Sequence, residues 1–193
     1  MDGAVLLIAA ALMGLLAGLA TGGSLRHLVA RRLRWPLVVI GAFLVKELLI
    51  RTPLGDSPAA PIVFALSLAV LIAWIVWHRD ELPGIWLVAA GITLNLAVVV
   101  ANGGHMVVAP AAAHLGPQQL SQQGAWAQYQ LMGPGTRLDW LGDWIQIPRP
   151  VGRLLPEAYS PGDVVSAVGL AVVLFRTTRP GRTRTRAGAI TSR

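Results

Sequence analysis

The chain has 193 residues, of which 54% are hydrophobic and only 13% are charged, and its net charge is +7 at pH 7. Soluble domains carry about 25% charged residues, and the hydrophobic residues here form uninterrupted blocks, so a multi-pass membrane protein is favoured over a large soluble domain. The lack of cysteine excludes disulfides, thiolate metal sites, iron–sulfur clusters and cysteine nucleophiles.

The hydrophobic blocks predict an all-α integral membrane protein with about five transmembrane helices. They cover about residues 4–20, 35–50, 61–77, 84–101 and 162–175, inside a single membrane domain of residues 1–178. A span needs about 20 mostly apolar residues. The second and fifth blocks are therefore short, and four spans with a half-buried fifth segment are the alternative. The first block lacks the positive start of a secretory signal, so we expect it to be retained.

The basic residues predict the direction of these spans. With the N-terminus outside, the inner side receives Arg26, Arg31, Arg32, Arg34, Arg79, Arg176, Arg179, Arg182, Arg184, Arg186 and Arg193, and the outer side receives Arg51, Arg137, Arg149 and Arg153. Basic residues favour the cytoplasmic side of a membrane, so we expect a cytoplasmic C-terminus. Residues 179–193 are then a disordered basic tail attracted to anionic lipid, and no nucleic-acid partner is expected.

A stripe of small residues in the first block predicts close helix packing. Ala10, Gly14, Gly18 and Gly22 recur every four residues, which places them on one face of a helix. Such residues let a neighbouring backbone approach closely, and this contact drives helix association in lipid. The stripe leaves open whether the partner is another span, a second copy or another membrane protein.

Two asparagines in the fourth block predict a polar face that looks into the bundle. Gly91, Asn95 and Asn102 lie at offsets of four and seven, on one side of a helix. A carboxamide that faces lipid is costly. The pair therefore makes either an interhelical hydrogen bond or the wall of a polar pocket that opens outward.

The outer loop, residues 102–161, is expected to contain short amphipathic or re-entrant helices. A glutamine-rich helix is predicted from about Pro117 to Met132, and Trp140 and Trp144 suggest a segment in the membrane interface. At the entry to the last span, Ser160 and Asp163 fit a capping box, with aspartate in place of the usual glutamate or glutamine.

We predict a candidate polar pocket from eight residues that the span assignments place toward the outer side of the membrane. Asn102 and Gly103 end the fourth helix, Gly104 allows a further turn, and the next residue is a histidine with acid–base capacity. Glu47 also has a simpler explanation, because it can pair with Arg51 one helical turn later. The candidate pocket consists of Glu47, Asn95, Asn102, Gly103, Gly104, His105, Asp143 and Asp163.

At these residues the sequence resembles a bacterial multi-pass membrane protein family, domain of unknown function 5317. The resemblance rests on three motifs in order: NGGHM at residues 102–106, RLDWLGDWIQIPRP at 137–150, and YSPGDVVSAVG at 159–169. The family pattern has a proline after the methionine, where this chain has Val107. The resemblance implies the fold and a location in the bacterial plasma membrane, and it implies no activity.

Two classes of function fit the sequence. The first is a membrane-complex subunit, scaffold or small-ligand binder, motivated by the small-residue stripe and the sparse ionisable groups. The second is an outer-face enzyme or transporter acting on a lipid head group or small polar molecule, with His105 as the acid–base group. Motifs for zinc proteases, serine hydrolases and phosphate-binding loops are lacking, so no metal and no cofactor is expected. Whether the protein is an enzyme is left open.

Overall fold

The computed structural model describes residues 4–30, 34–115, 118–148 and 158–179. It is mostly helical, and five long helices occupy the five hydrophobic blocks. They are α1 (Ala4–Ala20), α3 (Pro36–Arg51), α4 (Ala60–Trp77), α5 (Ile85–Ala101) and α7 (Pro161–Thr177). The helical character expected from the block pattern is confirmed, because each block is a continuous apolar run bounded by proline, glycine or polar residues.

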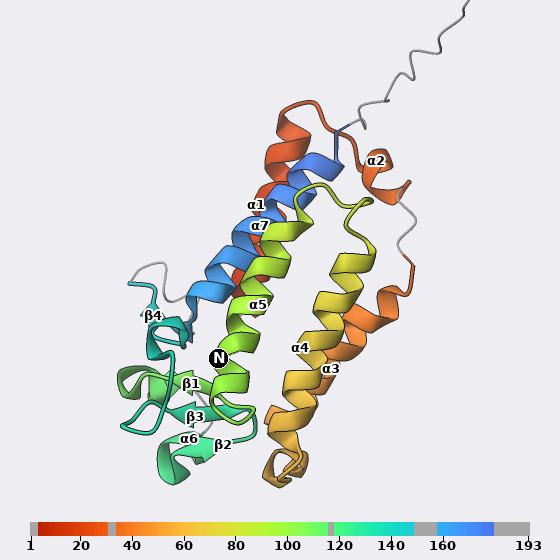
Figure 1. The fold of residues 1–193 in the computed structure, drawn as a ribbon. Coiled ribbons are helices and arrows are strands. Elements are labelled where there is room, and N and C mark those ends of the chain that lie inside the picture. Colours follow the sequence, from red (N-terminus) through yellow and green to blue (C-terminus); the bar gives the residue numbers. More distant parts are fainter. Residues whose placement is uncertain (1–3, 31–33, 116–117, 149–157, 180–193) are drawn as a thin grey trace, which may run out of the picture.

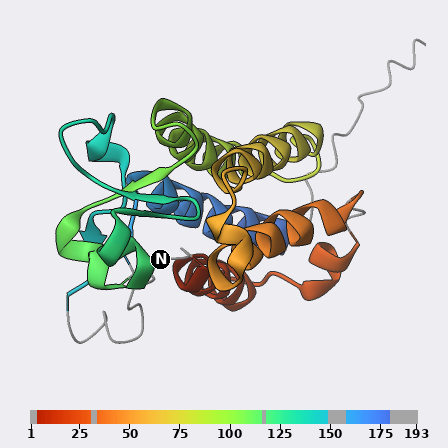
Figure 2. The ribbon, with the colours of Figure 1, turned by 90° about the horizontal axis from the view of Figure 1, so that it is seen from below.

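The helices run up and down in one bundle (Figure 1). Helix α7 packs along α1 on one side and α5 on the other, α4 lies beside α5, and α3 lies beside α4 (Figure 2). We call the end that holds the α3–α4 connection and residues 102–148 the loop end. The opposite end, with the α1–α3 connection and the C-terminus of α7, is called the basic end.

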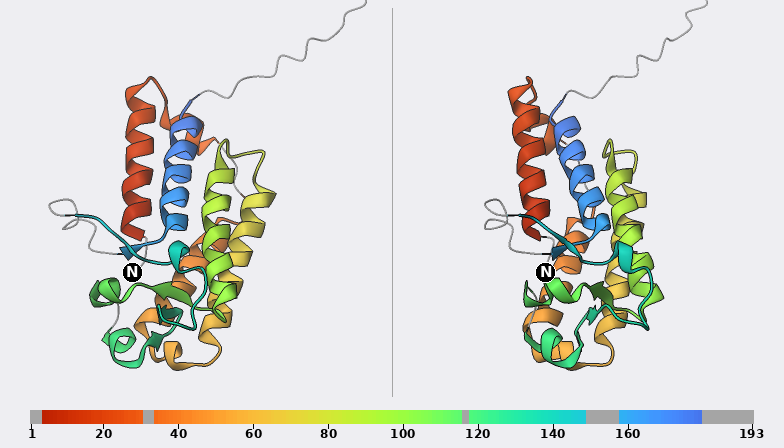
Figure 3. Two further views of the ribbon diagram at one scale, coloured as in Figure 1. Left: turned by 60° about the vertical axis from the view of Figure 1, so that its left-hand side comes forward. Right: turned by 90° about the vertical axis from the view of Figure 1, so that its left-hand side faces the viewer.

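The small residues of α1 allow its close approach to α7, as the two neighbouring helices in Figure 3 show. Ala10, Gly14 and Gly18 are the buried residues of α1. A Cβ atom at Gly14 would collide with the backbone of Ala171. Gly22 does not share this role, because it lies beyond the helix at φ +88° with open space around it. The partner of the stripe is therefore a helix of the same chain.

Side chains tie the connections together at the basic end. The short helix α2 (Leu25–Val29) follows α1, and the Ser24 backbone N–H before it donates to the Thr178 carbonyl at 2.8 Å. His78, after α4, accepts at Nε2 from the Arg34 backbone N–H at 3.1 Å. Trp74 Nε1 donates to the Arg34 carbonyl at 3.0 Å. These bonds hold α2 against α7 and the start of α3 against α4.

The loop end contains short sheets, so the expectation of an all-α fold is wrong there. The connection between α3 and α4 contains the single turn η1 (Pro53–Asp56). The segment between α5 and α7 forms β1 (Met106–Val108), η2 (Pro110–Leu115), α6 (Gln118–Gln123), β2 (Ala125–Trp126), β3 (Tyr129–Leu131), η3 (Asp139–Leu141), β4 (Ile145–Gln146) and β5 (Ala158–Tyr159). Strand β3 lies between β1, which is parallel to it, and β2, which is antiparallel; β4 pairs with β5. Strands of two or three residues are too short to show an alternating pattern.

The predicted glutamine-rich helix is consequently shorter than expected. It ends at Gln123 because Gly124 takes a left-handed conformation, φ +77°, and the chain then turns back as the β2–β3 hairpin. The expected interfacial segment around Trp140 and Trp144 contains the single turn η3, which strand β4 follows. Directly after His105 the chain forms strand β1, whose three residues are buried.

Among the residues described, only α4 has both the length and the hydropathy of a membrane-spanning helix. Helices α1 and α5 are apolar but have 17 residues each. The five spans expected from the sequence remain a prediction. Arg31, Arg32, Arg149, Arg153 and the tail from residue 180 onward lie outside the described residues.

Candidate functional site

A cavity of about 570 Å³ lies among the five long helices. Each helix contributes apolar side chains to its wall, for example Leu7, Phe43, Leu71, Ile92 and Leu170. The cavity falls within the range of about 300–1,000 Å³ that small-molecule sites occupy. Its wall is therefore suited to an apolar molecule or to the apolar part of a larger one.

The polar residues of this cavity gather toward the loop end. Lys46 and Asn95 come from the loop-end halves of α3 and α5, Asp163 and Ser166 come from the first turns of α7, and Asp143 comes from the outer loop. The remaining wall is almost entirely apolar. A ligand in this cavity would thus meet most of the hydrogen-bonding groups at one end, because the other hydroxyls of the wall, on Ser67 and Thr177, donate to carbonyls of their own helices.

A hydrogen-bonded network joins α5 to the start of α7 at this polar end. Asn95 Nδ2 donates to Asp163 Oδ1 at 2.8 Å, and Ser160 Oγ donates to Asn95 Oδ1 at 2.8 Å. The capping box is complete, because Asp163 N–H donates to Ser160 Oγ at 2.9 Å and Ser160 N–H donates to Asp163 Oδ2 at 3.1 Å. Asn95 thus makes the interhelical bond and also lines the cavity.

Two glycines bring α5 and α7 close enough for this network. A Cβ atom at Gly162 would collide with the Asn95 side chain, and one at Gly91 would collide with Ser166 and the Gly162 carbonyl. Gly91 and Asn95 are four residues apart on α5, as Gly162 and Ser166 are on α7. The two pairs therefore face each other across the helix interface.

Ser166 is the polar group of the cavity with unused hydrogen-bonding capacity. Its side chain lines the cavity, its residue is 5% exposed, and its Oγ has no hydrogen-bond partner among the described residues. Leaving a buried hydroxyl unpaired costs about 1–3 kcal/mol. The Oγ atom lies against Gly91 of α5, so a ligand would recover part of this cost only after the hydroxyl turns toward the cavity. Ser166 is not among the residues predicted from the sequence, although its spacing of three residues from Asp163 places the two side chains on one face of α7.

Asp143 reaches the cavity from the outer loop and is 3% exposed. Its backbone N–H donates to the Val107 carbonyl at 2.8 Å, and its carbonyl accepts from the Ala109 N–H at 3.0 Å. These bonds form a parallel bridge that anchors the carboxylate beside β1. Tyr129 of β3 lines the same end. The outer loop is thus built into the cavity wall.

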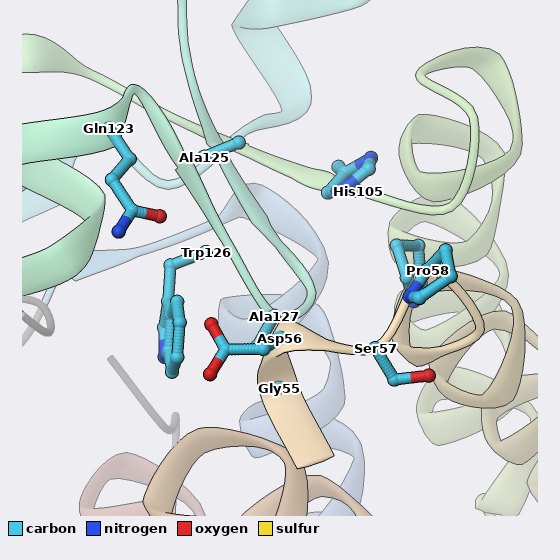
Figure 4. Close-up of a pocket in the computed structure, with 10 residues that line it drawn as sticks. Gly55, Asp56, Ser57, Pro58, His105, Gln123, Ala125, Trp126 and Ala127 are labelled. Atoms are coloured by element: carbon cyan, nitrogen blue, oxygen red, sulfur yellow. The ribbon is translucent and has the colours of Figure 1, made fainter. Parts of the chain in front are cut away.

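The structure separates His105 from these carboxylates. His105 lines a second pocket of about 280 Å³ on the loop end, which we call the outer pocket (Figure 4). The other walls of the outer pocket come from the α3–α4 connection and the β2–β3 hairpin. Asp143 and Asp163 line the helix cavity instead. Asp56 and Trp126, which line the outer pocket, were not singled out in the sequence.

The remaining predicted pocket residues form the turn after α5 or a surface pair. Gly103 and Gly104 take positive φ angles of +65° and +100°, and Gly104 packs on Pro61. Glu47 pairs with Arg51 at 2.6 Å and lines neither cavity. The simpler explanation of Glu47 therefore matches its position.

Asn102 fastens the outer loop to the end of α5. Its Oδ1 accepts from the Arg137 backbone N–H at 2.8 Å, and its Nδ2 donates to the Arg137 carbonyl at 2.8 Å. We expect Asn102→Ala to remove this attachment and to lower the free energy of unfolding by about 1–2 kcal/mol. Hydrogen exchange at the Arg137 amide should become faster, while exchange in β1 stays slow. Unchanged exchange at Arg137 would contradict this role.

Metal ligation finds no support in the part of the chain that the structure describes, since it contains no group of three or more His, Asp or Glu residues placed to hold an ion. No curated protein and no solved structure matches this sequence. A family model does match residues 31–175, which include all three motifs of the resemblance. The chain therefore belongs to DUF5317, a family of unknown function.

Proposed function

We propose that this protein is a multi-pass membrane protein whose helix cavity binds a single-chain amphipathic molecule. The apolar chain would lie among the five helices, and the polar end would meet Asn95, Asp163 and Ser166. The observation that carries this proposal is the cavity itself, with its apolar wall and its polar groups gathered at one end.

A membrane location is supported by the outer surface of the bundle. Large apolar side chains are exposed on all five long helices, among them Leu16, Leu44, Leu66, Trp86 and Val168. Charged residues are lacking in α1, α4 and α5 and occur only near the ends of α7 and in the loop-end half of α3. A continuous apolar surface of this kind is unfavourable in water and suits the hydrocarbon of a bilayer.

The charges at the two ends support an orientation with the loop end outside. Arg26, Arg34, Arg79, Arg176 and Arg179 lie at the basic end. The positive-inside rule would place this end in the cytoplasm. We extend the proposal to the bacterial plasma membrane, with the outer loop on the external face.

Entry of a membrane molecule is supported by the way α3 is attached. Helix α3 packs mainly on α4 and makes no comparably extensive contact with α1 or α7 among the described residues. Val39, Ile40 and Phe43 line the cavity and are also exposed, at 39%, 53% and 44%. The cavity therefore opens past α3 onto the apolar surface, where a lipid chain could enter sideways from a bilayer.

The geometry gives less support to the other roles considered from the sequence. A subunit or scaffold role was motivated by the sparse ionisable groups and by the small-residue stripe, and the stripe packs within the chain. An enzyme with His105 as an acid–base group beside Asp143 or Asp163 needs these side chains in one site, and they line different cavities. The cavity among the five helices supports small-ligand binding more than either of these roles.

Native mass spectrometry of protein extracted from its own membrane tests the proposal. Ala42 is 8% exposed and lines the cavity, so Ala42→Trp should fill the space and lower ligand occupancy by about tenfold. Leu44 lies on the same helix, is 53% exposed and lies outside the cavity wall, so Leu44→Trp is the matched control. Circular dichroism checks that both variants fold.

A Ser166→Ala variant tests the polar end separately. Loss of one hydrogen bond should weaken binding of the co-purified molecule by about three- to tenfold. A wild-type protein that carries no bound molecule would overturn the proposal. So would an Ala42→Trp variant that keeps the molecule at wild-type occupancy while folded.

A further inference from the structure

We propose that the outer pocket binds an organic ammonium group. The site is independent of the helix cavity, because the two are lined by different residues. Its walls are Asp56 and Ser57 after α3, His105 after α5, and Gln123 and Trp126 from the outer loop (Figure 4). Three segments that are distant in the sequence thus line one space of about 280 Å³.

Asp56 provides the negative charge. Its carboxylate projects into the pocket, and among the described residues no Lys or Arg side chain forms an ion pair with it. Arg51, five residues earlier, pairs with Glu47 at 2.6 Å. In the part of the chain that the structure describes, the pocket wall contains no Lys or Arg. Although the protein has a net charge of +7, a cation that enters this pocket would meet the Asp56 carboxylate and, among the described residues, no Lys or Arg side chain.

Trp126 provides an aromatic surface beside that carboxylate. Figure 4 shows the indole nearly edge-on, with the Asp56 carboxylate beside its face. The face of an indole carries negative electrostatic potential, so a carboxylate and this face both favour a cation between them. An anion in the same position would meet two repulsive groups.

The backbone holds the indole in place. A Cβ atom at Gly55 would lie 3.2 Å from Trp126 Cζ2 and 3.2 Å from the Ala127 Cβ. The α3–α4 connection therefore packs directly on the hairpin. Ala127 itself takes a left-handed conformation, φ +51°, which is strained for a residue with a Cβ. Strain of this kind concentrates at ligand sites, where surrounding structure holds the chain in an unfavourable geometry.

His105 and Gln123 supply hydrogen-bond acceptors for ammonium protons. His105 Nδ1 lies 3.3 Å from the Asn102 carbonyl, which places the ring proton on Nδ1 and leaves Nε2 as an acceptor. Gln123 contributes an amide oxygen. A primary ammonium has three donors, so it can bond to the Asp56 carboxylate and to one further acceptor of the wall, Gln123 on the Trp126 side or His105 on the opposite side (Figure 4).

Titration with methylammonium chloride tests the site, with sodium chloride at equal ionic strength as the control. The protein carries 5-fluorotryptophan, and the ¹⁹F signal of Trp126 is identified by its absence in Trp126→Phe. We expect this signal to shift saturably with methylammonium while the other tryptophan signals stay in place. Asp56→Asn should weaken the apparent affinity by about tenfold, because it removes the charge and leaves the shape.

Asp80→Asn is the matched charge control, because the Asp80 side chain is 88% exposed and lies outside the pocket. It should bind methylammonium like the wild type, and Asp56→Glu should retain most of the affinity if Asp56→Asn fails to fold. Equal shifts in sodium chloride, or an unchanged affinity in folded Asp56→Asn or in an Asp56→Ala variant, would overturn the proposal.

A second titration distinguishes a lipid head group from a free amine. Dihexanoyl phosphatidylethanolamine carries a primary ammonium, and dihexanoyl phosphatidylglycerol lacks one. A lower half-saturation concentration for the ethanolamine lipid than for methylammonium assigns a lipid as the ligand, and equal values assign a free amine. Saturation by the glycerol lipid with the same Trp126 shift would overturn recognition of ammonium. None of these results depends on occupancy of the helix cavity.

Discussion

Replacing Gly14 by alanine should lower the free energy of unfolding by about 3 kcal/mol, because the new methyl group has no room. Its Cβ would collide with the backbone of Ala171, which cannot rotate away as a side chain can. Helices α1 and α7 would have to separate along their shared length. Thermal unfolding in detergent, followed by circular dichroism, should show a fall in midpoint of roughly 6–12 °C.

Gly41→Ala is the control for this prediction. Gly41 also lies inside a helix, and a Cβ atom there would meet nothing within 4 Å. Alanine in a helix is more favourable than glycine by about 1 kcal/mol, so this variant should be as stable as the wild type or slightly more stable. If both variants were stabilised alike, the close approach of α1 to α7 would be contradicted.

Replacing Asp163 by alanine should lower the free energy of unfolding by about 2–3 kcal/mol. The change removes the acceptor for the Ser160 backbone N–H and the acceptor for Asn95 Nδ2, so the cap of α7 and the link to α5 are lost together. Asn95 Nδ2 would be left without its partner in a largely apolar wall. Chemical or thermal unfolding measures the effect.

Two further variants separate the network from a general effect of charge. Asp163→Asn keeps one oxygen that can accept, so it should lose about half of the stability that alanine loses. Asp80→Ala removes an exposed carboxylate and should change the free energy of unfolding by less than about 0.5 kcal/mol. Equal losses in the alanine and asparagine variants of Asp163 would show that the two hydrogen bonds do not act as described.

The main helices and the family could be predicted from sequence because their signals are local. Uninterrupted apolar runs and their bounding residues lie within a few turns of one another, and the capping box of α7 is contained in Ser160 to Asp163. The packing of α1 against α7 also has a local signal in the sequence, the small residues Ala10, Gly14 and Gly18. The ordered motifs after residue 102 likewise carried the family assignment.

The outer loop was predicted poorly because its structure depends on distant partners. Met106 pairs with Tyr129 in a parallel arrangement, and Ile145 pairs with Tyr159, across separations that no short pattern encodes. The glutamine-rich run has helical propensity before Gly124 and moderate propensity after it. Strand pairing overrides that propensity after Gly124, where the chain turns back.

The sequence by itself determined which segments are helices, which faces of α1 and α5 carry small or amide side chains, and to which family the chain belongs. Only the tertiary structure decided which polar residues lie in the helix cavity and which lie in the outer pocket. Asn95 and Asp163 share the helix cavity with Ser166, whereas His105 lies in the outer pocket with Asp56 and Trp126. The physical reason is that periodicity places a residue on a face of its own helix, while the groups that meet across a cavity depend on how helices and loops distant in the chain pack together.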